Sequence, residues 1–174
     1  MAQAIENLPK EAYTSWIRRV GAAIIDFIPA AIVGGIGEIV FFATGNTSCE
    51  SSEYGYGGYC TSSPSALGIV VAFLAWLLVL AYGIWNYGYR QGTTGSSIGK
   101  SVLKFKVVSE KTGQPIGFGM SVVRQIAHVV DSICYIGYLW PLWDPKRQTF
   151  ADKIIATVCL PTEGAPEAPS GAAT

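Results

Sequence analysis

Two long apolar runs, separated by a polar segment, dominate the pattern of hydrophobic and polar positions along the chain. They cover residues 20–43 and 66–87, and each is long enough to cross a bilayer, since about 20 helical residues suffice. Pro29 is expected to kink the first helix, because proline removes one backbone hydrogen bond. Small residues let a neighbouring helix approach closely in a membrane. The first run contains three of them close together, Gly34, Gly35 and Gly37.

Shorter patterns follow the second run. Residues 102–109 alternate between apolar and polar side chains, as a strand does. A turn is predicted at residues 111–113 and a returning strand at residues 114–118, which together make a short cytoplasmic β-hairpin. Residues 149–157 are expected to form a short amphipathic helix, with Asp152 and Lys153 exposed at its start.

Residues 120–143 allow two interpretations. Arg124, His128 and Asp131 form a polar stripe on one helical face, and the strongly apolar part covers only about 15 residues, which is short for a crossing. A crossing would also place the basic residues of segment 146–153 outside, against the positive-inside rule. We favour a re-entrant or interfacial third helix that returns to the cytoplasm, with a third transmembrane helix as the alternative.

Charge distribution sets the expected orientation in a bacterial plasma membrane. The loop at residues 44–65 has no Lys or Arg, whereas basic residues precede the first span and follow the second. The positive-inside rule therefore predicts that residues 1–19 and 88–119 are cytoplasmic and that the loop is extracytoplasmic. Residues 1–17 lack the apolar core of a signal peptide, so the first span is expected to stay as an anchor.

Composition supports a membrane protein. Half of the 174 residues are hydrophobic and only 14% are charged, compared with about a quarter in soluble domains. The formal net charge is zero, which gives no basic field for nucleic acid, so no nucleic-acid partner is expected. The predicted fold is an all-α membrane protein with two transmembrane helices, a third re-entrant or membrane-crossing helix and a short β-hairpin. Its predicted parts are an N-terminal segment (1–12), a membrane domain (13–160) and a Pro-, Ala- and Gly-rich disordered tail (161–174).

Arg19 and Asp26 are the most informative charged residues of the first span. They lie two helical turns apart on one face, and a charge near the bilayer centre costs roughly 2.5–3.5 kcal/mol on insertion scales. A structural interpretation joins Arg19 to Asp152 and gives Asp26 a second cation, for which Arg124 is the candidate. A functional interpretation makes Asp26 part of an ion or proton relay, with Asp131 or His128 as further stations.

Other candidate sites are few. Cys49 and Cys60 share the outer loop, where a disulfide is expected, and free thiols or a metal pair are the alternatives. His128 is the only histidine, and no ligand set for haem or zinc accompanies it. The segment at residues 94–101 is similar to a phosphate-binding loop but has the wrong glycine spacing. No cofactor, metal site or catalytic residue is predicted, and the chain is not expected to be an enzyme.

Three motifs together resemble the RDD family of integral membrane proteins. They are the pattern Trp16, Arg19, Asp26 in the first span, the Gly- and Ser-rich segment 92–100, and segment 146–153 around Asp152. The family is named for one arginine and two aspartates, which match Arg19, Asp26 and Asp152. Residues 85–152 are especially similar to mycobacterial members of the proline-rich-antigen type, without the long Pro-rich N-terminal arm of those proteins.

The resemblance implies two possible functions. The mycobacterial members suggest a non-enzymatic accessory subunit of the cytochrome bcc–aa3 respiratory supercomplex, which would make other integral membrane proteins and the lipid bilayer the partners. Other members suggest transport of ions or small solutes, of the Na⁺/H⁺ exchange type, through Asp26. Two or three spans cannot enclose a transport path alone, so the second function requires an oligomer.

Overall fold

The protein was analysed as a computed structural model that describes residues 8–51, 57–132 and 135–162. The chain divides into two compact units: Met1–Phe27 with Gly83–Thr174, and Ile28–Tyr82. We call these the polar unit and the hairpin unit. The fold is mostly helical, with two small antiparallel sheets. The predicted disordered tail lies outside the described residues from residue 163 onward, as do residues 1–7 of the predicted N-terminal segment.

Two helical segments are long and apolar enough to cross a membrane, Lys10–Ala43 and Ala66–Thr94. The first contains helix α2, Trp16–Ala43, with Pro29 inside it, and the second begins with helix α3, Ala66–Gly83. Only 11% of each apolar window is buried inside the protein, so nearly all of this apolar surface faces outward. Such exposure is costly in water and favourable in lipid, which agrees with the prediction of two spans.

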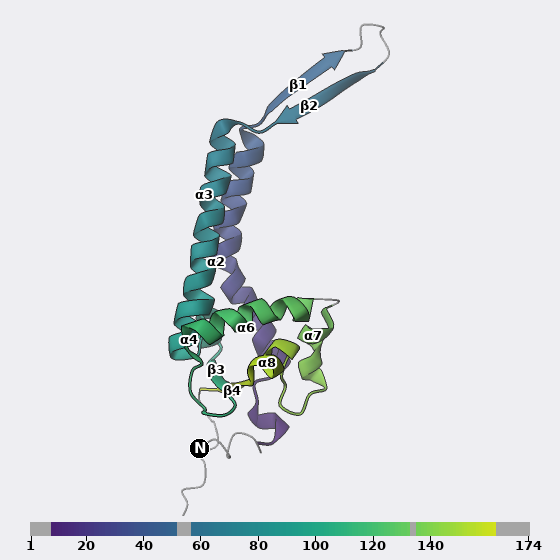
Figure 1. Ribbon diagram of the computed structural model, residues 1–174. Helices are drawn as coiled ribbons and strands as arrows, with labels where there is room; N and C mark the ends of the chain where they lie inside the picture. Colours follow the sequence, from purple (N-terminus) through teal and green to yellow (C-terminus); the bar gives the residue numbers. More distant parts are fainter. Residues whose placement is uncertain (1–7, 52–56, 133–134, 163–174) are drawn as a thin grey trace, which may run out of the picture. The chain divides into compact units, whose positions relative to one another are not determined.

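Small residues bring α2 and α3 together in the hairpin unit (Figure 1). Of its described residues only Gly37, Gly68 and Ala75 are buried. A Cβ atom on Gly37 would lie 2.6 Å from the Cβ of Ala75, and one on Gly68 would lie 2.8 Å from Oγ1 of Thr44. One glycine of the predicted cluster is therefore used for packing within the chain, while Gly35 faces open space.

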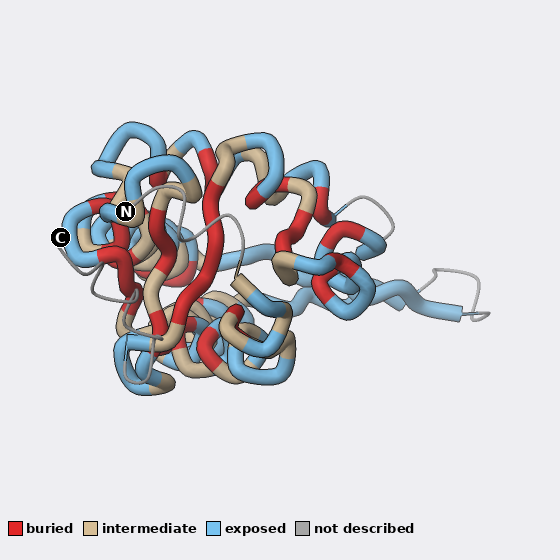
Figure 2. Tube along the Cα trace, turned by 90° about the horizontal axis from the view of Figure 1, so that it is seen from below, coloured by how far each residue is buried: buried red, intermediate tan, exposed pale blue. Residues whose placement is uncertain are grey.

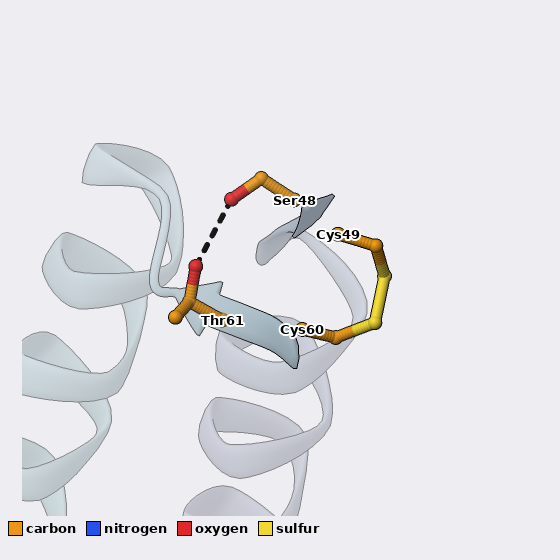
Figure 3. The surroundings of a disulfide bond; sticks show 4 residues. All are labelled: Ser48, Cys49, Cys60 and Thr61. Atoms are coloured by element: carbon orange, nitrogen blue, oxygen red, sulfur yellow. Dashed lines mark hydrogen bonds between the residues drawn. A yellow bond between two sulfur atoms is a disulfide. The ribbon is translucent and has the colours of Figure 1, made fainter. Parts of the chain in front are cut away.

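The polar loop between the spans is a β-hairpin of strands β1, Asn46–Ser51, and β2, Gly58–Ser63 (Figure 1). Every residue of both strands is exposed, as the pale-blue colour of these strands in Figure 2 shows. Cys49 and Cys60 face each other across the strands and form a disulfide, beside a hydrogen bond between Ser48 and Thr61 (Figure 3). The disulfide helps to stabilise a pair of strands that would be marginal alone.

The polar unit contains the N-terminal part of α2 and a series of short elements. These are η1, Lys10–Ala12; η2, Ile84–Arg90; α4, Gln91–Thr94; α5, Ile98–Val102; β3, Phe105–Ser109; α6, Gly117–Ser132; α7, Ile136–Leu139; η4, Trp140–Leu142; α8, Phe150–Ile155; and β4, Thr157–Pro161. Most buried residues of the protein belong to this unit, as the red stretches of Figure 2 show.

The partner of β3 differs from the predicted one. A returning strand at residues 114–118 is wrong, because β3 pairs with β4 in an antiparallel sheet, with Val107 opposite Cys159. One face of this sheet packs on Ala22 of α2, and the other face packs on Tyr13. Segment 157–161 pairs with β3 instead because its first four residues can be buried, which the Gln- and Pro-containing segment 114–118 does not offer.

Residues 120–143, for which a re-entrant or membrane-crossing third helix was expected, do not form one continuous helix. The chain forms α6, α7 and the short turn η4 instead, and α6 is not among the candidate spans. The described residues that follow α6 show two features that a continuous helix lacks. Tyr135 adopts a left-handed conformation with φ 56°, and a side chain on Gly137 would collide with Asp131. Glycine at position 137 therefore permits α7 to approach the end of α6 closely.

Helix α6 carries its polar face inward. Its buried residues are Ser121, Arg124 and Asp131, whereas Ile126 and Val129 are 65% and 64% exposed. A surface helix of a water-soluble domain has the opposite arrangement, with the apolar stripe toward the core. The outer face of α6 is therefore suited to an apolar environment.

Candidate functional site

The buried carboxylate of Asp152 binds two arginines within the polar unit. Its Oδ2 accepts a hydrogen bond from Nη1 of Arg19 at 2.8 Å, and its Oδ1 accepts from Nε and Nη2 of Arg124 at 2.9 and 2.6 Å. Burial alone would raise the pKa of Asp152, but the positive charges of Arg124 and Arg19 outweigh it and hold that pKa well below its ordinary value. This ion cluster connects α2, α6 and α8.

Asp152 reaches this position through a capping box at the start of α8. The hydroxyl of Thr149 accepts from the backbone N–H of Asp152 at 3.1 Å, and the N–H of Thr149 donates to Asp152 Oδ2 at 3.3 Å. The prediction that Asp152 is exposed is wrong, because its side chain is fully buried. Lys153 is 43% exposed and pairs with Asp144.

Asp131 supports the same helix from the other side. It accepts the backbone N–H groups of Phe150 at 2.9 Å and Ala151 at 3.3 Å, which are free amides of the first turn of α8. The other partner is Nδ1 of His128, 2.6 Å from Oδ2, and the His128 ring stacks on Tyr138. Burial outweighs the hydrogen bond that the ring makes to the Asp131 carboxylate, and it lowers the pKa of His128 below its ordinary value.

Asp26 lies in a separate cradle, and Arg124 is engaged with Asp152 instead. The carboxylate of Asp26 accepts hydrogen bonds from Asn86 Nδ2 at 2.8 Å, from Ser97 Oγ at 2.5 Å and from the backbone N–H of Gly99 at 2.7 Å. Gly99 is needed here because a Cβ atom at this position would collide with the backbone of Ala22. The cradle therefore fixes the start of α5 against α2.

An irregularity in the second span brings Asn86 to this cradle. Residues 84–90 form the wider turns of a π-helix, which are rare and often occur at functional sites. Both ends of the Asn86 amide are used, because its Oδ1 also accepts the N–H of Ile98 at 2.9 Å. The arrangement ties the end of the second span to α5 and to Asp26.

Asn86, Ser97 and Gly99 were not predicted as site residues. One signal was present: segment 94–101 is similar to a phosphate-binding loop, and its Gly99 N–H does donate to an anion. In the structure that anion is the Asp26 carboxylate of the same chain. Asn86 gave no comparable signal, since its position depends on the π-helical turns.

A cavity of about 580 Å³ adjoins these clusters and lies wholly within the polar unit. Part of its wall is apolar and comes from α2, including Ile24 and Phe27. The polar part of the wall contains Arg19, Asp26, Lys100, Arg124 and His128. The five residues of the predicted charge cluster therefore divide into three sets: Arg19, Arg124 and Asp152 together, Asp131 with His128, and Asp26 in its own cradle.

Lys100 is a cationic residue of the cavity wall that the sequence did not single out. Its ammonium donates to Gln91 Oε1 at 2.6 Å and to Ser97 Oγ at 3.3 Å, and it lies 5.2 Å from the centre of the Tyr87 ring. Burial lowers the pKa of Lys100 to about 8, and the positive charge of Arg124 adds to the shift.

The described residues give little support for a metal site or a reactive thiol. Within residues 8–51, 57–132 and 135–162, no group of three or more His, Cys, Asp or Glu side chains is arranged to hold a metal ion. Cys159 is a free, buried cysteine of β4, and burial raises the pKa of its thiol.

Two apolar helices able to cross a membrane, the Arg19–Asp152 ion pair and the separately held Asp26 define a membrane protein of a particular class. The chain belongs to the RDD family, whose family model matches residues 13–156. Arg19, Asp26 and Asp152 all lie within the matched region. No solved structure matches the chain at a significant level.

Mycobacterial proteins are similar to the chain over most of its length. It is 59% identical over 161 residues to the proline-rich antigen of Mycobacterium leprae, which covers 91% of this chain and 65% of that protein. Two proline-rich antigen homologs of Mycobacterium tuberculosis are 60% identical over 161 residues, with 67% of each covered. The chain thus spans about two thirds of the length of these relatives, and its resemblance to the proline-rich-antigen type is confirmed.

Proposed function

We propose that the chain is a non-enzymatic accessory subunit of a larger membrane complex, with the cytochrome bcc–aa3 supercomplex of actinobacteria as the candidate partner. The observation that carries the proposal is the cradle of Asp26. This carboxylate is held by a side-chain amide, a hydroxyl and a backbone N–H of its own chain. A group so engaged serves the fold, whereas an ion relay needs a carboxylate that exchanges its partners.

The proposal includes a topology. Inverted polarity of α6 supports an interfacial or re-entrant position for this helix, with its apolar side in lipid. The disulfide in the hairpin supports an extracytoplasmic location for residues 44–65, because disulfides persist in oxidising compartments. The N-terminus and the polar unit would then be cytoplasmic, in agreement with the charge distribution.

Outward-facing apolar side chains of α3 would supply the docking surface. Phe73 and Trp76 stack on each other and are 57% and 58% exposed. Large aromatic side chains dominate the energetics of protein interfaces, and lipid contact alone does not require them in the middle of a span. A partner helix packed on this pair is the contact that we propose.

Co-purification tests the proposal. An affinity-tagged chain would be extracted from actinobacterial membranes with a mild detergent, and the haem absorbance of the eluate would be measured. We expect b-, c- and a-type cytochromes to co-elute with the chain. Trp76→Leu should weaken this association, whereas Leu78→Ile, a matched change on the same helix, should not. Recovery of the chain only as a free monomer would contradict the proposal.

The cavity favours a second candidate function, transport of an ion or small solute by an oligomer. Asp26 contributes to the cavity wall, which is the geometry that a binding station requires. Purified chain in proteoliposomes would be assayed for proton and sodium flux under an imposed gradient. Flux abolished by Asp26→Asn would support this function, and absence of flux from the unaltered chain would exclude it.

A further inference from the structure

We propose that the cavity of the polar unit binds the phosphate headgroup of an anionic phospholipid, with Lys100 as the main cationic contact and the apolar wall of α2 beside an acyl chain. The proposal is independent of the accessory-subunit function, since a bound lipid is compatible with either candidate function. It rests on the charges of the cavity wall, the polarity of its two sides and its volume.

No described carboxylate accepts a hydrogen bond from the Lys100 ammonium, although the negative charges of Asp26 and Asp152 offset part of its positive charge. The acceptors of its ammonium are a side-chain amide and a hydroxyl, both neutral, and in the part of the chain that the structure describes it forms no ion pair with a carboxylate. A buried ammonium without a paired anion is costly. The lowered pKa of Lys100 is the expected mark of that cost. An anion in the cavity would remove it.

The acidic groups nearby are committed elsewhere. Asp152 is shared between Arg19 and Arg124, and Asp131 faces His128 and the backbone of α8. Asp26 is held by the three donors of its cradle. Nε and Nη2 of Arg19 are buried and have no acceptor among the described residues. Two buried nitrogens of Arg19 and the ammonium of Lys100 are therefore donors to which no described carboxylate is hydrogen-bonded.

The opposite wall of the cavity is apolar and belongs to a candidate membrane span. Ile24 and Phe27 of α2 contribute to it and are 60% and 66% exposed, so this wall is continuous with the outward-facing surface of the helix. A ligand with a charged head and an apolar tail matches both sides at once. A volume of about 580 Å³ suits a headgroup and the first part of a chain.

A soluble phosphate ester shares the headgroup chemistry but makes no use of the apolar wall. Basic residues beside a membrane span are a common way to recognise anionic lipids. Phosphatidylglycerol is the suitable probe, because its phosphodiester keeps one negative charge over the pH range in which Lys100 titrates. Phosphatidylcholine with the same acyl chains is the matched neutral lipid.

Native mass spectrometry of the delipidated full chain in a neutral detergent tests the proposal. We expect phosphatidylglycerol to bind about tenfold more tightly than phosphatidylcholine at pH 7, as one charge-assisted contact provides. Lys100→Gln should remove this preference, and Lys111→Gln, a change at an exposed lysine of the turn after β3, should keep it. Equal binding of the two lipids, or a preference that survives Lys100→Gln, would overturn the proposal.

Two further measurements test the proposal even if the Lys100→Gln variant fails to fold. Ala23→Leu narrows the cavity and leaves its charges in place, so both lipids should bind more weakly. Raising the pH from 7 to 9 should weaken phosphatidylglycerol binding to the unaltered chain, because Lys100 loses its proton near pH 8. Glycerol 3-phosphate should not displace the lipid. Displacement at comparable concentration would assign the site to a free phosphate ester and overturn the lipid assignment.

Discussion

Arg124 and Asp152 form a side-on ion pair in which Nε and Nη2 of the arginine donate to the same oxygen, Oδ1, at 2.9 and 2.6 Å. The two residues are 28 positions apart and belong to α6 and α8. Because Arg19 of α2 binds the other oxygen of Asp152, a single carboxylate connects three helices. This arrangement gives a structural reason for an arginine at the start of the first span, Arg19, and an acid in the C-terminal part of the chain, Asp152.

Removal of the carboxylate should be strongly destabilising. Asp152→Asn leaves Arg19 and Arg124 buried without their shared anion, and breaking a buried pair in this way costs about 3–5 kcal/mol. We expect a clear drop in the apparent melting temperature of the detergent-solubilised chain, measured by fluorescence. Glu11→Gln, at an exposed acidic residue of η1, is the control and should leave the melting temperature unchanged. Equal melting temperatures for the two variants would contradict the role of Asp152.

A second prediction concerns Gly99, the glycine whose N–H binds Asp26. Gly99→Ala would drive a methyl group into the backbone of Ala22, and an overpacked buried site costs about 1–3 kcal/mol. Gly119→Ala, in α6, meets open space and should be neutral or stabilising by up to about 1 kcal/mol. Melting temperatures of the two variants, measured side by side, test the close packing of α5 on α2. A tolerated Gly99→Ala would show that this packing is loose.

How much could be predicted from the sequence depended on the range of the interactions. The two spans are local patterns of hydropathy, and residues 20–43 and 66–87 lie within the two apolar segments of the structure. The pairing of β3 with β4 could not be predicted, because segment 157–161 is distant in sequence and no short turn connects it to β3. Segment 114–118 was a nearer candidate but offered less apolar surface to bury.

The charge cluster was predictable in its members and less so in its pairing. The family motif indicated Arg19, Asp26 and Asp152, but the assignment of Arg124 to Asp26 failed because charge alone does not distinguish two buried acids. Neutral groups decided the outcome: Asn86, Ser97 and the N–H of Gly99 hold Asp26, and this leaves Arg124 for Asp152. Amides and hydroxyls are common in any sequence, so their role emerges only when the fold brings them together.

Acidic pH should destabilise the chain through His128. The pKa of this residue is lowered below 6.5 in the folded state, so the unfolded chain binds the proton more readily. The contribution of His128 to stability is therefore complete above the ordinary value of 6.5 and is lost as the pH falls through the folded pKa. Melting temperatures between pH 7.5 and 5 should decline for the unaltered chain. His128→Gln should show a flatter profile, since no other histidine titrates in this range, and parallel profiles would contradict the assignment.

The disulfide leads to two predictions: one concerns the stability of the hairpin, and the other concerns the side of the membrane on which the hairpin lies. Cys49→Ser should cost about 2–3 kcal/mol for the pairing of β1 with β2, and hydrogen exchange over residues 46–63 is the direct measurement. Melting of the polar unit should change little, since the hairpin belongs to the other compact unit. In intact cells, a membrane-impermeant maleimide should label a Cys134→Ser variant, which lacks the remaining cysteine of the sequence, only after reduction. Cys159, buried in β4, should stay unlabelled and serves as the internal reference. If labelling of Cys49 and Cys60 requires lysis, the hairpin is cytoplasmic and the proposed orientation is reversed.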